Sequence, residues 1–514
     1  MINGAAGSQS RSADLLVQGL ARNPAAPLDV LRYLLRVAPS VACRGLKNRH
    51  NLSRPVQCVM VNHPSRVVRG TLAEHPDIDP EIRGRLLSDP DWRVTARAFG
   101  SPGQQAVSDD VLTALLTRIE DSPAEPESML SIPELYGELL TATRFDGRVY
   151  RLAAAHSDPR VRRHAAAVPQ QLDDLSRGAL MTDPVPEIRA VIAAAIAEDQ
   201  RAMQPADLPD RHCHGFWAVL QRPLSRALVD QVVASGDESA LYFVGPNPST
   251  PADVVRALLR HPAVDVRRRL TGRVDLTHEQ LLELAADAAV EVRTAVSVHP
   301  GLSEQERARI DIDVTTVDGH GHYGSRRVCR GNDHGLVDER APTLADASRW
   351  ARSVNPLLRR RAARNPDLPA DLVTLLADDS DLGVRVLLAR HHPDAPPALL
   401  LRCLLEYQGC GRESLPELPG FPTEGLAAFA DHTDPVVRRL VTLDPHAGPE
   451  LVERLCSDPD ITVRQSMAAC PRLPAARIVA LLDDPDLVEH AAANPALPVD
   501  RMHQVLAEVT SPKA

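Results

Sequence analysis

Side chains of the types that bind zinc gather in one Gly-rich stretch of the sequence, residues 318–335. Four of them lie there: His320, His322, Cys329 and His334. Imidazole nitrogens and thiolates are ligands that Zn²⁺ prefers. Their spacing fits no closed four-ligand motif, and Gly-rich loops also collect His without binding a metal. We therefore predict no metal and no other cofactor, and we keep a metal or enzyme site in the segment 315–342 as an alternative.

Residue patterns of the common enzyme classes are missing from the sequence. Lys occurs only at Lys47 and Lys513. A nucleotide-binding phosphate loop needs a Lys after its glycines, and Schiff-base chemistry needs a Lys amine, so the sequence supports neither class. There is no Gly-x-Ser-x-Gly, and the nearest approach to a His-Glu-x-x-His zinc motif, at His278, lacks the second His. The small cluster His212-Cys213-His214 is weaker still. We predict no catalytic residues and a protein that is not an enzyme.

A recurring arginine is the clearest candidate for binding a partner. An apolar residue followed by Arg recurs along the chain, and in four copies a further Arg comes directly after it: Arg163, Arg268, Arg360 and Arg439. A guanidinium pairs with a carboxylate through two parallel hydrogen bonds. A positive track in a protein of net charge −10 therefore favours an acidic protein or peptide partner. The alternative interpretation is an ordinary solvated helix face.

Nucleic-acid binding along an Arg-lined groove is a further alternative. The net charge of −10 counts against it, because the phosphate backbone attracts basic proteins. The chain has only 3 Trp, 6 Tyr and 6 Phe, and single strands are usually held by stacking bases on such rings. We therefore place nucleic acid below protein as the expected partner.

An internal repeat must position these residues. Segments 247–267 and 365–385 align without a gap, and nine of their 21 positions are identical. The apolar-Arg step is the marker of each copy: Arg44, Arg69, Arg93, Arg162, Arg189, Arg267, Arg293, Arg359, Arg385, Arg438 and Arg464. Single steps are 24–27 residues long, and longer steps indicate degenerate copies or insertions. We predict insertions at 101–148, 199–231, 315–342 and 406–425.

Each copy has the pattern of two short helices. In the first, Leu372, Val373, Leu375 and Leu376 form an apolar stripe at helical spacing. The second lies within 458–471, with Asp458 as a candidate N-cap, and its length allows either α-helix or 3₁₀-helix. Neither helix can bury its stripe alone, so stacked copies are predicted to form a solenoid.

His and Asn exchange before the prolines of the repeat. Five His residues precede Pro: His63, His75, His261, His299 and His392. The prolines that follow Asn23, Asn247, Asn365 and Asn494 have the same setting. A position shared by His and Asn points to a turn rather than to catalysis, which would need one particular copy.

The frame Asn-Pro-x-Leu-Pro, Leu-Leu, Asp-Pro-Asp-x-x-Val-Arg, Ala resembles the leucine-rich repeat variant family, bacterial relatives of HEAT-type repeats. The resemblance covers about three quarters of the chain and implies a right-handed superhelix in which α-helices alternate with 3₁₀-helices. It also implies that the repeated Asp and Arg of neighbouring copies pair along the inner helices. Some members carry an N-terminal iron–sulfur cluster. Here Cys43 and Cys58 belong to no four-Cys cluster, so we expect none.

Together these patterns predict an all-α protein, a single elongated right-handed α-solenoid over 1–514 with two-helix repeats of about 25 residues. We expect a non-enzymatic scaffold that binds a protein or peptide along its concave surface. No apolar run approaches the ~18 residues of a membrane span, so we expect no membrane partner and a cytoplasmic location.

Overall fold

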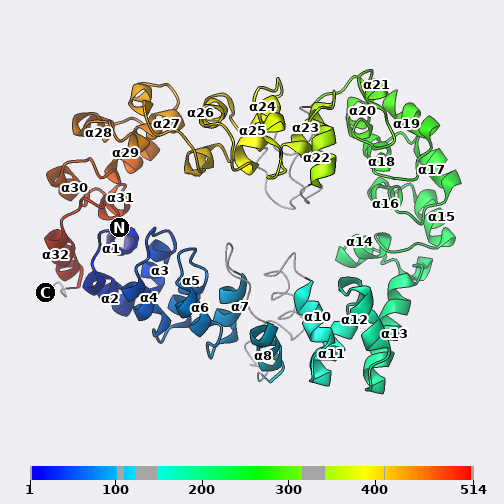
Figure 1. Ribbon diagram of the computed structural model, residues 1–514, viewed down its shortest axis with the longest axis horizontal. Coiled ribbons are helices and arrows are strands. Elements are labelled where there is room, and N and C mark those ends of the chain that lie inside the picture. The colour runs from blue at the N-terminus through cyan, green and yellow to red at the C-terminus, as the bar shows by residue number, and fades with distance from the viewer. Residues whose placement is uncertain (1–2, 101–108, 122–146, 315–341, 410, 511–514) are drawn as a thin grey trace. The chain divides into compact units, whose positions relative to one another are not determined.

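The computed structural model describes residues 3–100, 109–121, 147–314, 342–409 and 411–510 (Figure 1). Among these residues all regular secondary structure is helical, apart from one isolated bridge between Met203 and Leu224. The protein is therefore all-α, as predicted. No helix in the described ranges is both long and apolar enough to cross a membrane.

The described residues form two compact units, and the first contains both ends of the chain: residues 1–199 with 424–514. Its N-terminal part comprises α1 (Asn3–Arg22), α2 (Leu28–Val37), α3 (Pro39–Lys47), α4 (Arg54–Val61), α5 (Arg66–Ala73), α6 (Pro80–Leu86), α7 (Trp92–Gly100), α8 (Asp109–Asp121), α10 (Arg148–Ala154), α11 (Pro159–Ala166), η1 (Pro169–Gln171), α12 (Asp174–Met181) and α13 (Pro186–Gln200). Its C-terminal part comprises η4 (Leu426–Phe429), α27 (Pro435–Arg438), η5 (Arg439–Leu443), α28 (Pro449–Leu455), α29 (Ile461–Ala468), α30 (Ala475–Leu481), α31 (Val488–Ala492) and α32 (Val499–Thr510).

The second unit is residues 200–423. It comprises η2 (Pro205–Asp207), α14 (His214–Leu220), α15 (Arg226–Ser235), α16 (Glu238–Val244), α17 (Ala252–Leu258), α18 (Val264–Leu270), α19 (His278–Ala285), α20 (Val290–Val296), α21 (Glu304–Arg307), α22 (Leu344–Trp350), α23 (Pro356–Ala362), α24 (Ala370–Ala377), α25 (Leu382–His391), α26 (Pro397–Glu406) and η3 (Arg412–Glu417). The one array predicted over 1–514 stays a prediction, because the structure describes the units separately.

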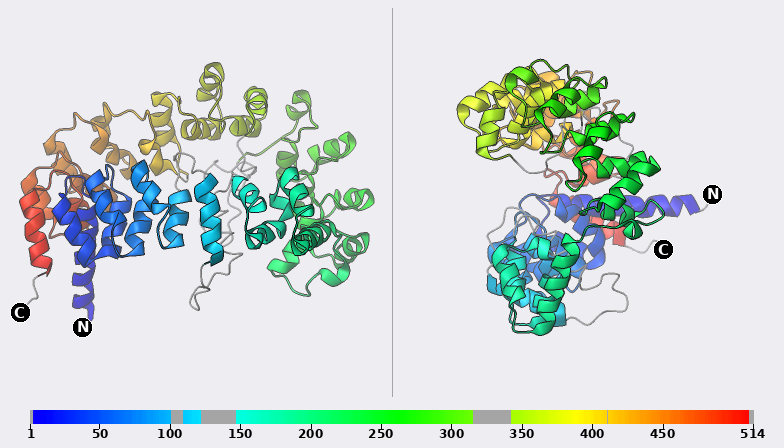
Figure 2. Two further views of the ribbon diagram at one scale, coloured as in Figure 1. Left: turned by 60° about the horizontal axis from the view of Figure 1, so that its bottom comes forward. Right: turned by 90° about the vertical axis from the view of Figure 1, so that its right-hand side faces the viewer.

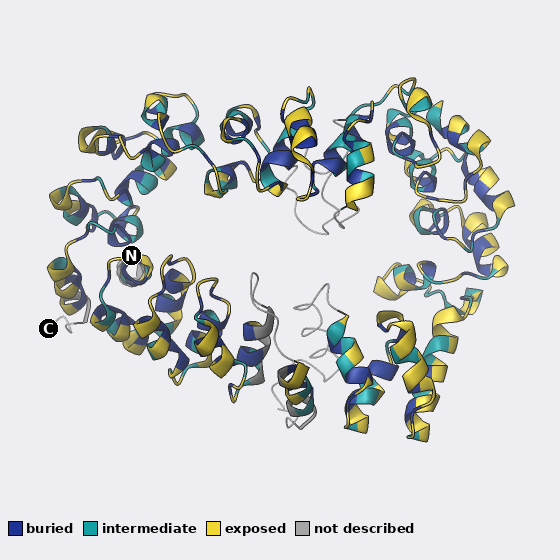
Figure 3. Ribbon diagram, viewed as in Figure 1, coloured by how far each residue is buried: buried dark blue, intermediate teal, exposed yellow. Residues whose placement is uncertain are grey.

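Within each unit a helix packs against the next helix and against the one after that. In the first unit α1, α3, α5 and α7 contact one another in one row, and α2, α4 and α6 form a second row. In the second unit α14, α16, α18 and α20 form such a row. Figure 3 shows the result, since most helices bury one side and expose the other.

The helix 370–377 shows how the apolar stripe is used. Leu372, Val373 and Leu376 are buried, as the spacing predicts. Leu375 is instead 48% exposed, so its assignment to the stripe is wrong. Residues 372, 373 and 376 follow the i, i+1, i+4 pattern of one helix face, whereas residue 375 lies outside that face.

The repeated Asp and Arg pair between neighbouring copies, as the resemblance implies; we call this series the arginine ladder. In one step, Arg267 donates through Nε and Nη2 to Asp287 at 2.7 and 2.9 Å, and through Nη1 to the His261 carbonyl of its own turn. Four more pairs have this geometry: Arg69–Asp89, Arg162–Asp183, Arg359–Asp379 and Arg438–Asp458. In all five pairs both side chains are largely buried, so the ladder holds adjacent copies together.

The predicted N-cap at Asp458 is wrong. Asp458 accepts hydrogen bonds from the Arg438 guanidinium. The N-cap of α29 is instead Asp460, which accepts a hydrogen bond from the Thr462 N–H at 2.8 Å. Asp434 and Asp158 are likewise N-caps, of α27 and α11. Two different carboxylates therefore precede Arg464: one accepts from the arginine of the preceding copy, and the other caps the helix.

The His and Asn residues before proline serve turns, but two different turns. His63 and His261 follow the first helix of a copy, whereas His75, His299 and Asn247 follow the second. Each ring Nδ1 or amide oxygen accepts an N–H from two residues later. After the second helix, the side chain also reaches back, as in the 2.9 Å contact of His299 Nε2 with the Arg273 carbonyl.

The four predicted insertions stay predictions, and the structure shows what some of these ranges contain. Segment 199–231 contains α14 and the first part of α15, and both helices pack on α16. Segment 101–148 contains the helix α8, and segment 406–425 contains the 3₁₀-helix η3. Residues 315–341, with the proposed zinc ligands His320, His322, Cys329 and His334, lie outside the described residues.

Candidate partner-binding surface

Four of the chain's aromatic residues meet on two neighbouring helices of the second unit. Phe216 and Trp217 lie on α14, and Tyr242 and Phe243 lie at the equivalent positions of α16, 26 residues later. Because α14 packs against α16, the Trp217 and Phe243 rings approach to 5.0 Å between centroids. Phe216 meets Trp217 edge-on at 4.8 Å, and Tyr242 meets Phe243 at 5.3 Å. The repeat thus aligns the rings across two copies.

An arginine of the third copy extends this row. The Arg269 guanidinium, from α18, lies over the Tyr242 ring at 4.4 Å from its centroid. Within the part of the chain that the structure describes, this guanidinium makes no hydrogen bond or ion pair, and its Nε is buried. Cation–π attraction of roughly 0.5–2 kcal/mol orients it without neutralising its charge. We call Trp217, Tyr242, Phe243 and Arg269 the aromatic–arginine surface.

The other end of the row is closed by an acid–imidazole contact. The His212 ring lies 4.7 Å from Phe216 and 4.8 Å from Trp217, and its Nε2 is 2.6 Å from Asp237 Oδ2. Burial alone raises the pKa of Asp237, but the contacts with His212 and with the Ala240 and Ser239 N–H groups outweigh it and hold the pKa below its usual value. Asp237 therefore carries its charge while it caps α16, and its partner is His212.

The aromatic–arginine surface offers flat apolar faces beside the Arg269 guanidinium, which has no acidic partner in the ranges that the structure describes. Trp217, Tyr242, Phe243 and Arg269 are each half-buried, and Trp217 and Phe243 pack on the core of the second unit. Their orientation is therefore set before anything binds, which reduces the entropy lost on association. Trp, Tyr and Arg are also the residues that dominate binding energy at protein interfaces. The arrangement suits a partner in which an apolar side chain and a carboxylate lie next to each other.

The four arginines predicted to form a track have four different environments. In the first unit Arg163 is exposed on α11, and Arg439 is half-buried and donates to Ser466 Oγ at 3.1 Å. In the second unit Arg268 pairs with Asp265 of its own helix at 2.9 Å. Arg360 is 1% exposed. The structure therefore does not bring these residues together as one exposed set.

The expectation that Arg360 is available to a partner is wrong. Its Nε and Nη2 donate to Asp381 at 2.7 and 2.8 Å, and this pair is enclosed between α23 and α25. Gly383 makes the room: a Cβ there would lie 2.7 Å from the Arg360 Cζ. Arg360 and Arg439 reach the next copy, whereas Arg268 pairs within its own helix. Asp381 and Gly383 on the facing helix account for the burial of Arg360.

Metal-ligand types do not converge in the described ranges. No group of three or more His, Cys, Asp or Glu side chains there has the geometry to hold a metal ion. In the cluster His212-Cys213-His214, His212 contacts an acidic residue, Asp237. The segment 315–341 lies outside these ranges.

The sequence did contain a signal for the aromatic–arginine surface. The aromatic pairs 216–217 and 242–243 are one repeat apart, as are Phe243 and Arg269. Counting aromatic residues over the whole chain hid this local concentration. A comparison with known protein families finds no family that matches the chain, and a comparison with curated proteins finds no match.

Proposed function

We propose that this protein is a non-enzymatic scaffold, a right-handed α-solenoid of two-helix repeats, that binds a protein or peptide partner on the aromatic–arginine surface. The row of α14, α16 and α18 would then line the concave side. The observation that carries the proposal is Arg269, a half-buried guanidinium that lies over the Tyr242 ring and has no carboxylate partner among the described residues. The ladder arginines, by contrast, have carboxylate partners within the fold.

The partner segment should carry an acidic residue next to an apolar or aromatic one. A carboxylate of the partner that reaches Arg269 would form a charge-assisted hydrogen bond with its guanidinium. The Nε of this guanidinium is already buried and has little contact with water. The neighbouring Trp217 and Phe243 rings would cover the apolar side chain. The short spacing of the four residues suits a peptide segment better than a flat protein face.

The test is selection of peptides from a displayed random library against the full-length chain, followed by affinity measurement of the selected peptides. We expect enrichment of Asp or Glu beside an apolar residue, and an affinity about 10-fold to 100-fold weaker for Arg269→Gln. Arg260→Gln is the matched control, since Arg260 already pairs with Glu283 at 2.8 Å on the exposed side of the same unit. Selection of no peptide sensitive to Arg269→Gln would contradict the proposal.

Single-stranded nucleic acid is the second candidate, because bases stack on the same kinds of ring. The Trp217–Phe243–Tyr242 row is the observation in its favour, and the net charge of −10 is the one against it. Oligonucleotides are therefore titrated in the same assay. Oligonucleotide binding that depends on Arg269 and Tyr242 and weakens steeply with salt would replace the peptide proposal.

A further inference from the structure

The two ends of the chain pack against each other as consecutive copies of the repeat. Asn494, after α31, donates to the Ala468 and Cys470 carbonyls of the preceding copy, both at 2.8 Å. Asn23, after α1, donates in the same way to the Ala492 and Asn494 carbonyls, at 2.8 and 2.7 Å. Asn23 and Asn494 are 471 residues apart in the sequence. The first copy therefore continues the stack that the last copy ends; we call this contact, between α31–α32 and α1–α2, the terminal joint.

The backbone approach at the terminal joint repeats the approach between covalently linked copies. A Cβ on Gly19 of α1 would overlap the Glu489 carbonyl and lie 2.7 Å from the Ala492 Cβ. One copy later, a Cβ on Gly45 would overlap the Gln18 carbonyl and lie 2.8 Å from the Ala21 Cβ. Two helices related by one repeat thus use the same glycine contact at both places. The terminal joint therefore repeats the glycine and asparagine contacts between linked copies, without a linking loop.

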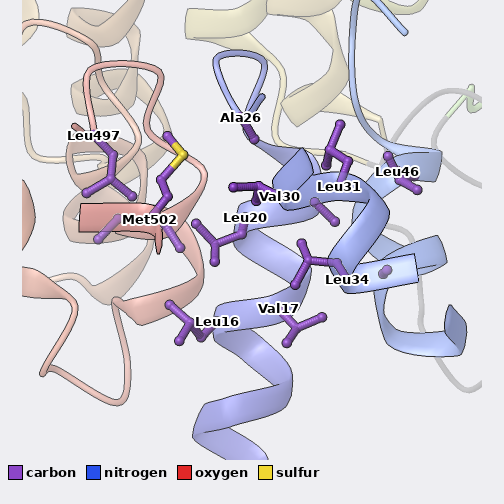
Figure 4. Packing of buried hydrophobic residues seen from close by; sticks show 14 of the residues in the cluster. Leu16, Val17, Leu20, Ala26, Val30, Leu31, Leu34, Leu46, Leu497 and Met502 are labelled. Atoms are coloured by element: carbon purple, nitrogen blue, oxygen red, sulfur yellow. The ribbon is translucent and has the colours of Figure 1, made fainter. Parts of the chain in front are cut away.

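Apolar burial at the terminal joint is continuous with the core. Leu16 and Leu20 of α1 belong to the same buried cluster as Leu497 and Met502, which face them in Figure 4. Two polar contacts flank the cluster: Gln18 Nε2 donates to Glu489 at 2.8 Å, and His503 Nε2 is 2.8 Å from Asp29. In the left view of Figure 2, the red helix α32 lies beside the dark blue helix α1, and α31 packs directly against α1.

We propose that the α31–α32 face is an acceptor for the α1–α2 helix pair of a second copy of this chain. Its own α1–α2 pair occupies this face in the closed monomer, without a covalent link to it. The two surfaces are different and complementary, so an opened chain exposes one of each. Such heterologous pairs join molecules head to tail, and exchange of an identical element is a low-cost route to association. Closure within one chain competes with pairing between chains, so the monomer prevails when the protein is dilute.

The test uses two full-length variants that damage opposite sides of the joint. Gly19→Leu removes the α1 side and leaves the acceptor, whereas Ala492→Leu removes the acceptor and leaves the α1 side. Each variant alone should be a monomer with its helical circular-dichroism signal retained and α1 sensitive to protease. Mixed in equal amounts, they should form a 1:1 heterodimer that grows no further, because only one intact pair of surfaces remains. Gly84→Leu is the control, since nothing lies within 4 Å of a Cβ there.

A second measurement needs no substitution. Two isotope-labelled forms of the unaltered chain are unfolded, mixed and refolded over a range of concentrations, and their masses are read under native conditions. Mixed dimers and longer chains should increase with concentration. Monomers alone at every concentration, or two folded variants that do not associate on mixing, would overturn the proposal.

Discussion

Arg360 and Asp381 form a bidentate ion pair between the neighbouring helices α23 and α25, and their side chains are 2% and 11% exposed. Asp381 also caps α25 by accepting the Val384 N–H at 2.9 Å. One carboxylate thus fixes both the start of a helix and the arginine of the preceding copy. The interior of the second unit therefore depends on matching charges as well as on apolar packing.

Removing Arg360 should be costly because it leaves Asp381 with an uncompensated charge. We expect Arg360→Ala to lower the free energy of unfolding by about 3–5 kcal/mol, measured by urea denaturation. Arg163→Ala, at the equivalent but exposed position, should change it by less than about 0.5 kcal/mol. Gly383→Ala should also destabilise by displacing the Arg360 guanidinium, and the two changes together should cost less than their sum. Strict additivity would show that Gly383 does not act through Arg360.

Leu372 and Leu375 provide a matched pair on one helix. Leu372 is 1% exposed and Leu375 is 48% exposed. Leu372→Asp buries an unpaired carboxylate and should destabilise by several kcal/mol, with loss of helix spreading to adjacent copies. Leu375→Asp should leave the thermal unfolding midpoint nearly unchanged. Equal midpoints for the two variants would show the assignment of the buried face to be wrong.

The arginine ladder should make the free energy of unfolding depend on pH in the acidic range. The hydrogen bond from Arg438 is the largest cause that lowers the pKa of Asp458, and Arg162 acts in the same way on Asp183. A carboxyl whose folded pKa lies below its unfolded value of about 3.9 stabilises the fold above that value, and this stabilisation is lost as the pH falls through the folded pKa. Asp458→Asn should therefore lower stability at neutral pH and flatten the loss in acid. Asp265→Asn, at an exposed carboxylate, should do neither.

The terminal joint should weaken at a higher pH than the arginine ladder does. Burial is the main cause that lowers the pKa of His490 on α31; Arg22 and Arg439 lower it further, and Glu489 opposes them. Because the folded pKa lies below the unfolded value of about 6.5, the neutral imidazole is favoured in the fold, and stability is lost as the pH falls below that value. Cleavage of α1 by protease should accelerate from about pH 7.5 to about pH 5.5. His490→Gln should remove most of this acceleration; an unchanged profile would exclude His490 as its origin.

The repeat period was enough to predict the all-α architecture, whereas the Asp–Arg pairing between neighbouring copies was implied by the resemblance to HEAT-type repeats. The repeat pattern identified Arg267 as one of the recurring arginines but did not identify Asp287 as its acceptor. It did not distinguish Asp458 from Asp460, since both precede the same arginine and only their hydrogen bonds separate a ladder acceptor from a helix cap.

The environment of Arg360 could not be read from its own position. Arg163, Arg268 and Arg360 occupy equivalent positions, yet their burial ranges from exposed to complete. The difference comes from Gly383 and Asp381 on the facing helix, and pairing across copies is a property of two positions rather than of one. The contact of Asn23 with Asn494 was hidden for the same reason, because the repeat shows which residues are equivalent but not which copies touch.

The terminal joint also has a consequence for biosynthesis. Leu16 and Leu20 are synthesised about 480 residues before Leu497 and Met502, which belong to the same buried cluster. At roughly 5–20 residues per second this is a delay of about 25–100 s. During that interval an apolar helix face has no native cover, and such surfaces promote aggregation. We expect the yield of this protein in a cell to depend on chaperones that shield nascent chains, more than its local helical contacts alone would suggest.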